Sequence, residues 1–230
     1  MNNKRSVCIV GAGGGIGSSA ARLFKEEGYE EIILMDLPSE ALNKVATEID
    51  GYSIDIDLRE TQSIEMAFAV AKKRLDSIHA LLLISGVIEN RNLSNMTIDL
   101  WNEIISTNLS SVFFAIKYAL PHMKRKKWGR IINIASVHGL VASINKAAYV
   151  VAKHGVIGLT KAVALETAET NITCNAICPG WVYTPLVEAQ VIKKSTITFP
   201  RTSWQKGRNA KIAVLVPISI SSISPGTGNE

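Results

Sequence analysis

A run of glycines between two regular elements is the feature that most constrains this sequence. Gly11-Ala12-Gly13-Gly14-Gly15-Ile16-Gly17 follows the strand-like segment Ser6–Val10 and opens the helical pattern Ile16–Gly28. Glycine lets the backbone turn tightly and approach a ligand without a Cβ in the way, and the helix start offers free N–H groups. The pattern predicts a phosphate-binding turn with contacts from Gly11, Gly14, Gly15, Ile16 and Gly17; a purely structural turn is the alternative.

Strand and helix patterns then alternate along the chain. Strands are expected at Ser6–Val10, Glu31–Met35, Tyr52–Ile56, His79–Ile84, Arg130–Ala135 and Ile172–Ile177. Helices are expected at Ile16–Gly28, Glu40–Ile49, Thr61–Leu75, Thr97–Lys126 and Ala148–Thr170. This order predicts an α/β fold of the Rossmann type, a doubly wound parallel sheet in three α/β/α layers. Several strands are apolar throughout, as in sheets covered on both faces.

The character of the sequence changes near residue 190. Residues 1–190 form the expected catalytic and cofactor-binding domain, whereas residues 191–230 are basic and rich in Ser, with one further strand conceivable in Ala210–Ile220. The second segment carries six Lys and Arg residues against Glu230 alone, so it accounts for the whole net charge of +5. The first 190 residues therefore sum to zero, which argues against a nucleic-acid-binding face on the domain.

Composition also bears on compartment and metal binding. No apolar run reaches the roughly 18 residues of a membrane helix, and the N-terminus runs straight into a strand pattern without room for a signal peptide. Cys8, Cys174 and Cys178 form no disulfide framework, and no His or further Cys completes a metal site beside them. We expect a cytoplasmic protein with no membrane partner and no metal.

Asp36 ends the second predicted strand, nineteen residues after Gly17. A carboxylate there can accept hydrogen bonds from both hydroxyls of an adenosine ribose and would repel a 2′-phosphate. No Arg or Lys stands in the neighbouring Leu34–Leu37. The position favours NAD over NADP as cofactor; alternatively, Asp36 begins the turn at Pro38.

Tyr149 and Lys153 are four residues apart on a predicted helix and so share a face. Free tyrosine ionises near pH 10, and a neighbouring cation is expected to lower that pKa until the phenolate can take the proton of an alcohol. Ser136 ends a predicted strand, where open parallel sheets bind ligands, and can donate a hydrogen bond to the substrate oxygen. Alternatively, the pair lies on the surface and Ser136 caps a turn.

These motifs, with Asn108 and Pro179-Gly180, resemble the short-chain dehydrogenase/reductase family in order and spacing over residues 5–190. The resemblance implies that Asn108, Ser136, Tyr149 and Lys153 are catalytic, with Asn108 holding a water that links Lys153 to solvent. It implies that Pro179, Gly180, Val182 and Thr184 line the nicotinamide and that Asp57 and Leu58 flank the adenine. Leu37, Ser85, Gly86, Tyr149 and Lys153 are also expected at the cofactor.

Gly129–Gln190 is similar in particular to one branch, the D-3-hydroxybutyrate dehydrogenases, through Ile132–Ser143 and Cys178-Pro179-Gly180-Trp181. The resemblance implies that His138, Lys146 and Gln190 hold a substrate carboxylate, with Trp181 beside the substrate. Cationic and amide donors suit a small acid with little apolar surface. Alternatively, His138 only bonds its own loop, Lys146 is a solvated charge and Gln190 is an exposed helix residue.

The sequence departs from the family at several positions. The family's Asn-Asn-Ala-Gly reads Leu83-Ile84-Ser85-Gly86 here, Ile88 stands where the branch has a substrate-contacting Gln, and Val10 replaces Thr. The usual lid and last strand are not recognisable after Gln190; loss of that strand would expose a sheet edge and alter the expected homo-oligomer. Two other hypotheses follow: an enzyme for another small hydroxy or oxo compound, or an NAD-binding protein without catalysis.

Overall fold

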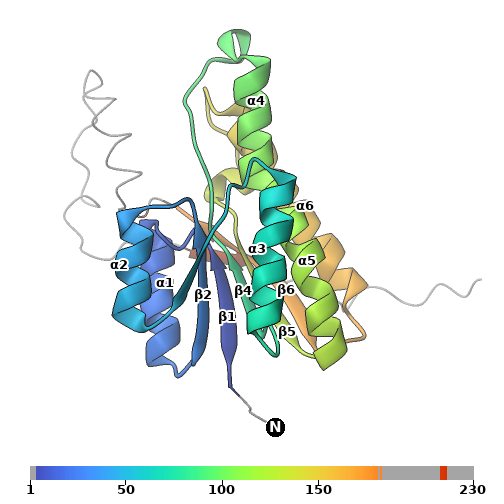
Figure 1. The fold of residues 1–230 in the computed structure, drawn as a ribbon. Helices are drawn as coiled ribbons and strands as arrows, with labels where there is room; N and C mark the ends of the chain where they lie inside the picture. Colours follow the sequence, from blue (N-terminus) through green and yellow to red (C-terminus); the bar gives the residue numbers. More distant parts are fainter. Residues whose placement is uncertain (1–3, 181, 183–212, 217–230) are drawn as a thin grey trace, which may run out of the picture.

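A computed structural model describes residues 4–180, 182 and 213–216 of the chain, which form a three-layer α/β domain (Figure 1). The sheet has the strand order β3-β2-β1-β4-β5-β6-β7. Its strands are β1 Ser6–Val10, β2 Glu31–Asp36, β3 Tyr52–Asp55, β4 Ala80–Leu83, β5 Gly129–Ile134, β6 Ile172–Pro179 and β7 Ala213–Val216. β1 to β6 are parallel, which confirms the predicted Rossmann-type fold.

β7 is the further strand that the sequence left open after residue 190. It lies inside the conceivable strand Ala210–Ile220 and runs antiparallel to β6, with Ala176 opposite Val216 and Pro179 opposite Ala213. An antiparallel edge strand is a common addition to a doubly wound sheet. The edge of β6 is therefore covered over its carboxyl half, Ala176 to Pro179.

Six helices connect the strands, and their bounds are close to those predicted. They are α1 Gly15–Glu26, α2 Glu40–Ile49, α3 Thr61–Arg74, α4 Ile98–Ile105, α5 Ser111–Lys126 and α6 Ala147–Glu166. The prediction of a single helix over Thr97–Lys126 is wrong in one respect, because a π-helical turn at Ser106–Ser110 divides this stretch into α4 and α5. Such turns carry one extra residue and re-aim the side chains that they contain.

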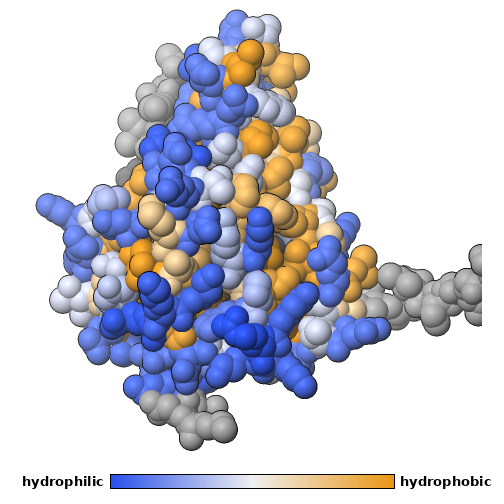
Figure 2. All heavy atoms as spheres, turned by 45° about the vertical axis from the view of Figure 1, so that its right-hand side comes forward, coloured by the Kyte–Doolittle hydropathy of each residue, from blue (hydrophilic) through white to orange (hydrophobic). Residues whose placement is uncertain are grey.

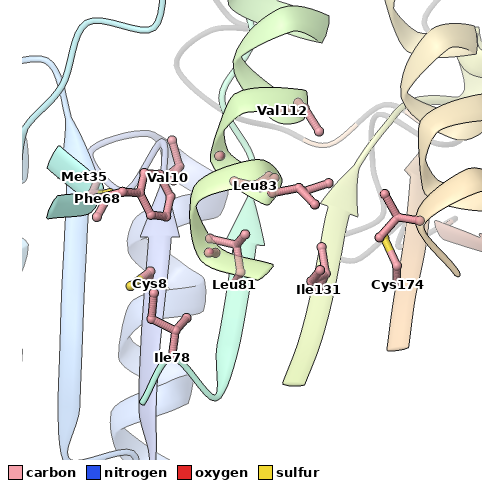
Figure 3. Packing of buried hydrophobic residues seen from close by; sticks show 14 of the residues in the cluster. Cys8, Val10, Met35, Phe68, Ile78, Leu81, Leu83, Val112, Ile131 and Cys174 are labelled. Atoms are coloured by element: carbon pink, nitrogen blue, oxygen red, sulfur yellow. The ribbon is translucent and has the colours of Figure 1, made fainter. Parts of the chain in front are cut away.

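Two hydrophobic clusters join the helices to opposite faces of the sheet. α1 and α2 cover one face, where Val7, Ile9, Leu34 and Leu82 are buried. α3, α5 and α6 cover the other, where Cys8, Val10, Met35, Leu81 and Leu83 meet Phe68 and Val112 (Figures 1 and 3). Alternate residues of each strand enter alternate clusters, as the pleat requires.

Burial is uneven across the sheet. Every residue of β1 and β4 is buried, which agrees with their continuous apolar sequences. In β5 and β6, buried residues alternate with partly or fully exposed ones, so the described residues cover these strands fully on one face only. The central strands, which are buried along their whole length, are therefore covered on both faces. β5 and β6, in which buried and exposed residues alternate, are covered on one face.

The strand order reverses between β1 and β4. β1 pairs with β2 on one side and with β4 on the other, so the connections leaving β1 and β4 diverge at their carboxyl ends. A crevice at such a point is where open parallel sheets bind ligands. The glycine turn after β1 and the Ser85-Gly86 segment after β4 both lie there.

α6 is the one helix of the described residues that is long and apolar enough to span a membrane. It packs against β6 and contributes Val156, Ile157, Val163 and Ala164 to the second hydrophobic cluster. A core helix of a folded domain meets the same length and hydropathy test. The position of α6 in this fold is that of a core helix.

A histidine joins β1 and β4 at the amino ends of the strands, opposite the crevice. The backbone N–H of Ser6 donates to Nδ1 of His79 (3.1 Å), and the N–H of His79 donates to Oγ of Ser6 (3.2 Å). Nδ1 must be unprotonated to accept this bond. Burial lowers the pKa of His79; the charge of Lys126 acts in the same direction and that of Glu31 opposes it.

This arrangement predicts that the protein loses stability as the pH falls below about 6.5, the pKa of an unfolded histidine. The folded pKa of His79 is the lower one, so unfolding takes up a proton and acid favours the unfolded state. The substitution His79→Asn keeps an acceptor at the position of Nδ1 but removes the titration. Urea unfolding at pH 7.5 and 5.5 should show a smaller pH dependence in this variant; an equal pH dependence would contradict the assignment. Part of the dependence should remain, because the pKa of His122 is also lowered by burial.

Candidate active site

The predicted phosphate-binding turn has the geometry of a close backbone approach. Gly11 adopts a φ of 89°, which favours glycine, and its N–H donates to Met35 O (2.8 Å). A Cβ on Gly17 would lie 2.0 Å from Gly11 O, so the first turn of α1 packs directly on β1. A Cβ on the exposed Gly14 would have Gly11 O at 3.6 Å as its nearest neighbour, which leaves open space in front of the helix start at Gly15. The turn therefore fits a pyrophosphate group at the N-terminus of α1.

Asp36 is attached to this turn. Its Oδ2 accepts the N–H of Gly13 (2.9 Å) and its Oδ1 accepts the N–H of Leu37 (2.8 Å). The two bonds join the carboxyl end of β2 to the glycine turn, and each carboxylate oxygen keeps a further lone pair for a ribose hydroxyl. Leu37 is 49% exposed beside it. Asp36 thus fits the predicted ribose contact and also shapes the turn.

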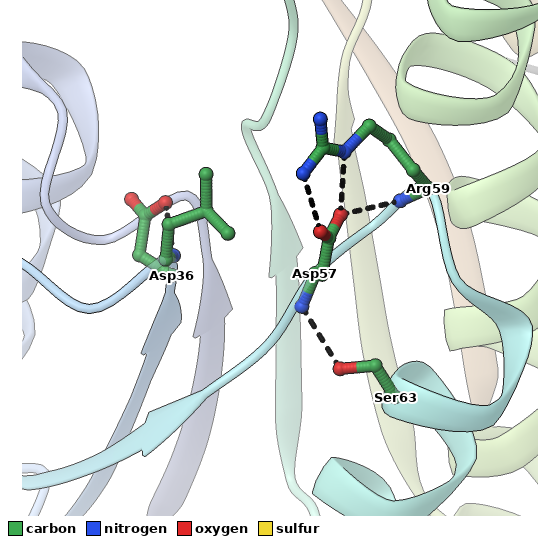
Figure 4. A network of polar contacts seen from close by, with 5 residues as sticks. Asp36, Asp57, Arg59 and Ser63 are labelled. Atoms are coloured by element: carbon green, nitrogen blue, oxygen red, sulfur yellow. Dashed lines mark hydrogen bonds and ion pairs between the residues drawn. The ribbon is translucent and has the colours of Figure 1, made fainter.

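Asp57 lies across from Asp36 at the end of β3, and its carboxylate is already paired (Figure 4). Arg59 binds it through Nε (2.9 Å) and Nη2 (2.6 Å), and this pair holds the pKa of Asp57 below its usual range. The N–H of Asp57 donates to Ser63 Oγ (2.9 Å). Leu58 packs partly buried against the core. The adenine contact predicted for this segment stays a prediction, with Arg59 as a neighbour that the sequence analysis did not consider.

Ser85 and Gly86, after β4, close the crevice from the other side. A Cβ on Gly11 would lie 2.7 Å from both N and Oγ of Ser85, so the two segments touch. A Cβ on Gly86 would lie 2.7 Å from Asn108 Oδ1 and 3.6 Å from Lys153 Nζ. The missing side chain of Gly86 therefore keeps space next to two of the four predicted catalytic residues.

Asn108 owes its position to the π-helical turn. Its side chain is fully buried, and Nδ2 donates to Ile104 O (2.8 Å) and to Val87 O (3.0 Å). Oδ1 is buried without a partner in the described part of the structure. A buried acceptor of this kind is usually satisfied by an ordered water. The arrangement fits the role of holding a water near Lys153.

Ser136 and Tyr149 come from β5 and α6, which pack tightly here. Ser136 Oγ accepts the N–H of His138 (3.1 Å) in a 3₁₀ turn over Val137–Gly139. A Cβ on Gly139 would lie 2.7 Å from Lys153 O, so this turn rests on α6. The Ser136 side chain also acts on Tyr149 and lowers the pKa of its phenol. The structure thus brings the serine and the tyrosine together as predicted.

Burial dominates the ionisation of Tyr149 and Lys153. It raises the pKa of Tyr149, and the Ser136 side chain opposes this only in part. It lowers the pKa of Lys153 to about 8. Lys153 Nζ donates to Ile134 O (2.9 Å) and lies 5.7 Å from the centroid of the Tyr149 ring. Burial thus raises the pKa of Tyr149 in the protein without ligands, and the predicted lowering by Lys153 stays a prediction for the site with its cofactor bound.

The predicted substrate residues are only partly described. Lys146 is 4% exposed, and its charge helps burial to lower the pKa of His138, which favours a neutral imidazole. The His138 ring contacts that of Tyr149 edge-on at a centroid distance of 6.0 Å. Lys146 is thus not the solvated charge of the alternative interpretation. Pro179 ends β6, Gly180 and Val182 follow it, and all three are half-buried. Trp181, Thr184 and Gln190 lie outside the described residues.

Cys178 was not among the residues predicted at the site. It is 1% exposed, and burial raises the pKa of its thiol, whereas Ser136 and Lys153 act in the opposite direction. Its place directly before Pro179-Gly180 was the signal that could have placed it at the site. No group of metal-binding side chains occurs within the described ranges.

Comparison with known proteins identifies the family. The sequence profile of the short chain dehydrogenases matches residues 5–195. The chain belongs to this family. It is 41% identical over 193 residues to a D-beta-hydroxybutyrate dehydrogenase of Rhizobium meliloti (strain 1021), which covers 81% of this chain and 75% of the relative. The enzyme of the same name from Cupriavidus necator is 40% identical over 195 residues, with coverages of 83% and 76%.

A solved structure gives the same result. A variant of actinorhodin polyketide ketoreductase, crystallised with NADPH, superimposes with a TM-score of 0.81 and 30% identity, covering 90% of this chain and 81% of that one. The predicted family is therefore confirmed, and the chain is an oxidoreductase of the short-chain type. The roles of its individual residues stay predictions.

Two glycines of the turn should respond differently to alanine. Gly17→Ala should destabilise the protein by about 3 kcal/mol or more, because its Cβ meets backbone that cannot move aside. Gly14→Ala should change stability by less than about 0.5 kcal/mol, since its φ of −75° suits alanine and its surroundings are open. Gly14→Ala should nevertheless weaken NADH binding about tenfold by obstructing the pyrophosphate. Urea unfolding and NADH fluorescence titration measure these effects; unchanged NADH affinity in Gly14→Ala would contradict the predicted phosphate contact.

Proposed function

We propose that this protein is an NAD-dependent dehydrogenase that interconverts D-3-hydroxybutyrate and acetoacetate. The observation that carries the proposal is a buried ammonium, Lys146, three residues before Tyr149 at the mouth of a short-chain dehydrogenase site. A buried cation beside the reacting groups suits a substrate that carries a carboxylate. The identity of about 40% to D-beta-hydroxybutyrate dehydrogenases supports the same substrate.

In the proposed reaction Tyr149 is the acid-base group. Its hydroxyl, which lies beside Ser136, takes the proton of the substrate alcohol while hydride leaves the carbinol carbon. Ser136 donates to the substrate oxygen as the carbonyl forms. When bound, an oxidised nicotinamide would supply the hydride acceptor and a positive charge near Tyr149. Because burial raises the pKa of Tyr149, the protein needs such additional positive charge to favour the phenolate.

Lys153 and Asn108 then return the proton to solvent. With a pKa lowered to about 8, Lys153 exchanges protons more readily near neutral pH than a free lysine does. Its ammonium holds one bond to Ile134 O and faces the space beside Gly86. Asn108 Oδ1, which has no partner among the described residues, borders the same space. A water bridging these groups would complete the path.

The cofactor of the proposal is NAD rather than NADP. Asp36 presents a carboxylate at the end of β2, fixed by the N–H groups of Gly13 and Leu37. A 2′-phosphate at this position would meet a negative charge. Arg59, which Figure 4 shows across from Asp36, is engaged by Asp57. Both features support NAD.

A different small hydroxy or oxo compound is the second candidate, and Ile88 favours it. The half-buried Ile88 lies two residues after Gly86 and stands where the hydroxybutyrate branch has a polar contact. An apolar side chain there suits a substrate with less polarity near the oxygen. The identity of about 40% to D-beta-hydroxybutyrate dehydrogenases, together with the charge of Lys146 beside His138, favours the first candidate.

The proposal also includes a homo-oligomer and a location in the cytoplasm. Apolar side chains gather on the side of the molecule that carries α5 and α6 (Figure 2), where Phe113, Val151 and Leu165 are 47%, 47% and 45% exposed. Such surfaces suit contact with a second copy of the chain. Cys8, Cys174 and Cys178 are free and buried, which suits a reducing compartment such as the cytoplasm.

The central test is Tyr149→Phe. The wild type should reduce NAD with D-3-hydroxybutyrate, with kcat/KM at least about tenfold higher than with NADP. Tyr149→Phe should lower kcat at least about a hundredfold by removing the acid-base group, while NADH fluorescence titration should show retained binding. If the variant reacts as fast as the wild type, the mechanism is wrong. If the wild type binds NADH but oxidises neither D-3-hydroxybutyrate nor neutral secondary alcohols, the protein is a binding protein without catalysis.

Lys146→Met tests the substrate class. The variant keeps the length of the side chain but lacks the charge that should hold the carboxylate. We expect KM for D-3-hydroxybutyrate to rise about tenfold or more, because the variant loses one charge-assisted hydrogen bond to the substrate. KM for 2-butanol should stay unchanged. An equal rise for both substrates would show that Lys146 does not bind the carboxylate.

A further inference from the structure

The backbone reverses direction just before Lys146. Asn145 has a φ of 59°, in the left-handed region that side chains other than those of Gly, Asn and Asp rarely adopt. On one side of it Ile144 is 86% exposed, and on the other Lys146 is 4% exposed. The chain therefore passes from solvent to the interior within three residues, and the conformation of Asn145 makes this passage.

The same residue receives a hydrogen bond from the opposite wall of the site. Arg91 N–H donates to Asn145 O (2.8 Å). Arg91 ends the segment Gly86–Arg91, which begins beside Asn108 and Lys153 and is attached there because Val87 O accepts Asn108 Nδ2 (3.0 Å). The segment thus joins the proton-relay end of the site to the loop that carries Lys146.

The position of Asn145 also decides where α6 begins. Lys146 O accepts the N–H of Val150 (2.8 Å), the first helical bond of α6, and Tyr149 lies in this first turn. Tyr149 is held inside α6, which the bonds of Lys153 and Thr160 join to β5. Lys146 lies just before α6, so its direction relative to the segment Gly86–Arg91 depends on the φ of Asn145.

We propose that Asn145 is a positioning residue for substrate selection, whose left-handed backbone directs Lys146 into the site and presents its carbonyl to Arg91 N–H. The inference rests on the proposed function, in which Lys146 holds the substrate carboxylate. It assigns selectivity for acids to the backbone of a residue whose own side chain is exposed. A β-branched residue resists this conformation and would turn Lys146 away. A glycine adopts it freely.

The experiment compares Asn145→Val with Asn145→Gly in the full chain with NAD. In Asn145→Val, KM for D-3-hydroxybutyrate should rise about tenfold (about 1.4 kcal/mol), whereas kcat and KM for 2-butanol should stay within about twofold of the wild type. Asn145→Gly should resemble the wild type with both substrates. Amide hydrogen exchange at Arg91 should accelerate in Asn145→Val only, because its acceptor moves.

Lys127→Val is the matched control. Lys127 has a φ of 54° at the end of α5, next to the amino end of β5 and so at the opposite edge of the sheet from the site. The Lys127→Val variant should lower the melting temperature as Asn145→Val does. It should leave KM unchanged for both D-3-hydroxybutyrate and 2-butanol. A shared loss of stability is thereby separated from the effect on substrate selection.

The outcomes are distinct. A wild type that turns over 2-butanol but not D-3-hydroxybutyrate contradicts the proposed function, and the inference with it. A wild type that prefers the acid, together with an Asn145→Val variant that loses both substrates equally or neither, contradicts only the role of Asn145. Loss of acid selectivity in Asn145→Gly as well would assign the effect to the amide side chain and overturn the backbone argument.

Discussion

The burial of the Lys153 ammonium against the carboxyl end of β5 is the constraint on which the active site depends. Its bond to Ile134 O joins α6 to the central sheet, and Asn133 Nδ2 makes a second buried bond between the same elements, to Thr160 Oγ1 (2.9 Å). Because a buried charge is costly, α6 must keep its register against β5 for the carbonyl to remain within reach. Tyr149, one helical turn earlier, is thereby held beside Ser136. The same burial that fixes the geometry moves the pKa of Lys153 down and that of Tyr149 up.

The part of the crevice next to the glycine turn is formed by backbone segments that pack so closely that a side chain would not fit between them. The glycine turn touches Ser85 on one side and the first turn of α1 on the other. Asp36 adds a carboxylate that accepts a turn N–H, so the shape of the turn and the charge beside it arise from one residue. Gly86 then separates this region from Asn108 and Lys153. Space left by absent side chains connects the phosphate-binding turn to the proton path.

Much of this was predictable from local patterns. The glycine run, the apolar strands and the four-residue spacing of Tyr149 and Lys153 are short-range features, and helix and strand geometry translate them directly into space. The antiparallel direction of β7 was not predictable, because four residues of strand pattern carry no information on direction. The π-helical turn around Asn108 was also missed, since it spans five residues between two stretches that each keep a helical pattern. Cys178 was missed because its neighbours Ser136 and Lys153 come from other parts of the chain.

The sequence by itself determined the layered α/β architecture and predicted Ser136, Tyr149 and Lys153 as catalytic residues, because the first follows from periodicity and the second from motif spacing. Only the tertiary structure decided how far these groups are buried. Desolvation depends on what every neighbouring element covers, and it raises the pKa of Tyr149 in the protein without ligands. Tertiary structure also decided that Lys146 is buried while Ile144 is exposed, because one left-handed backbone angle and a bond from a distant loop set their directions.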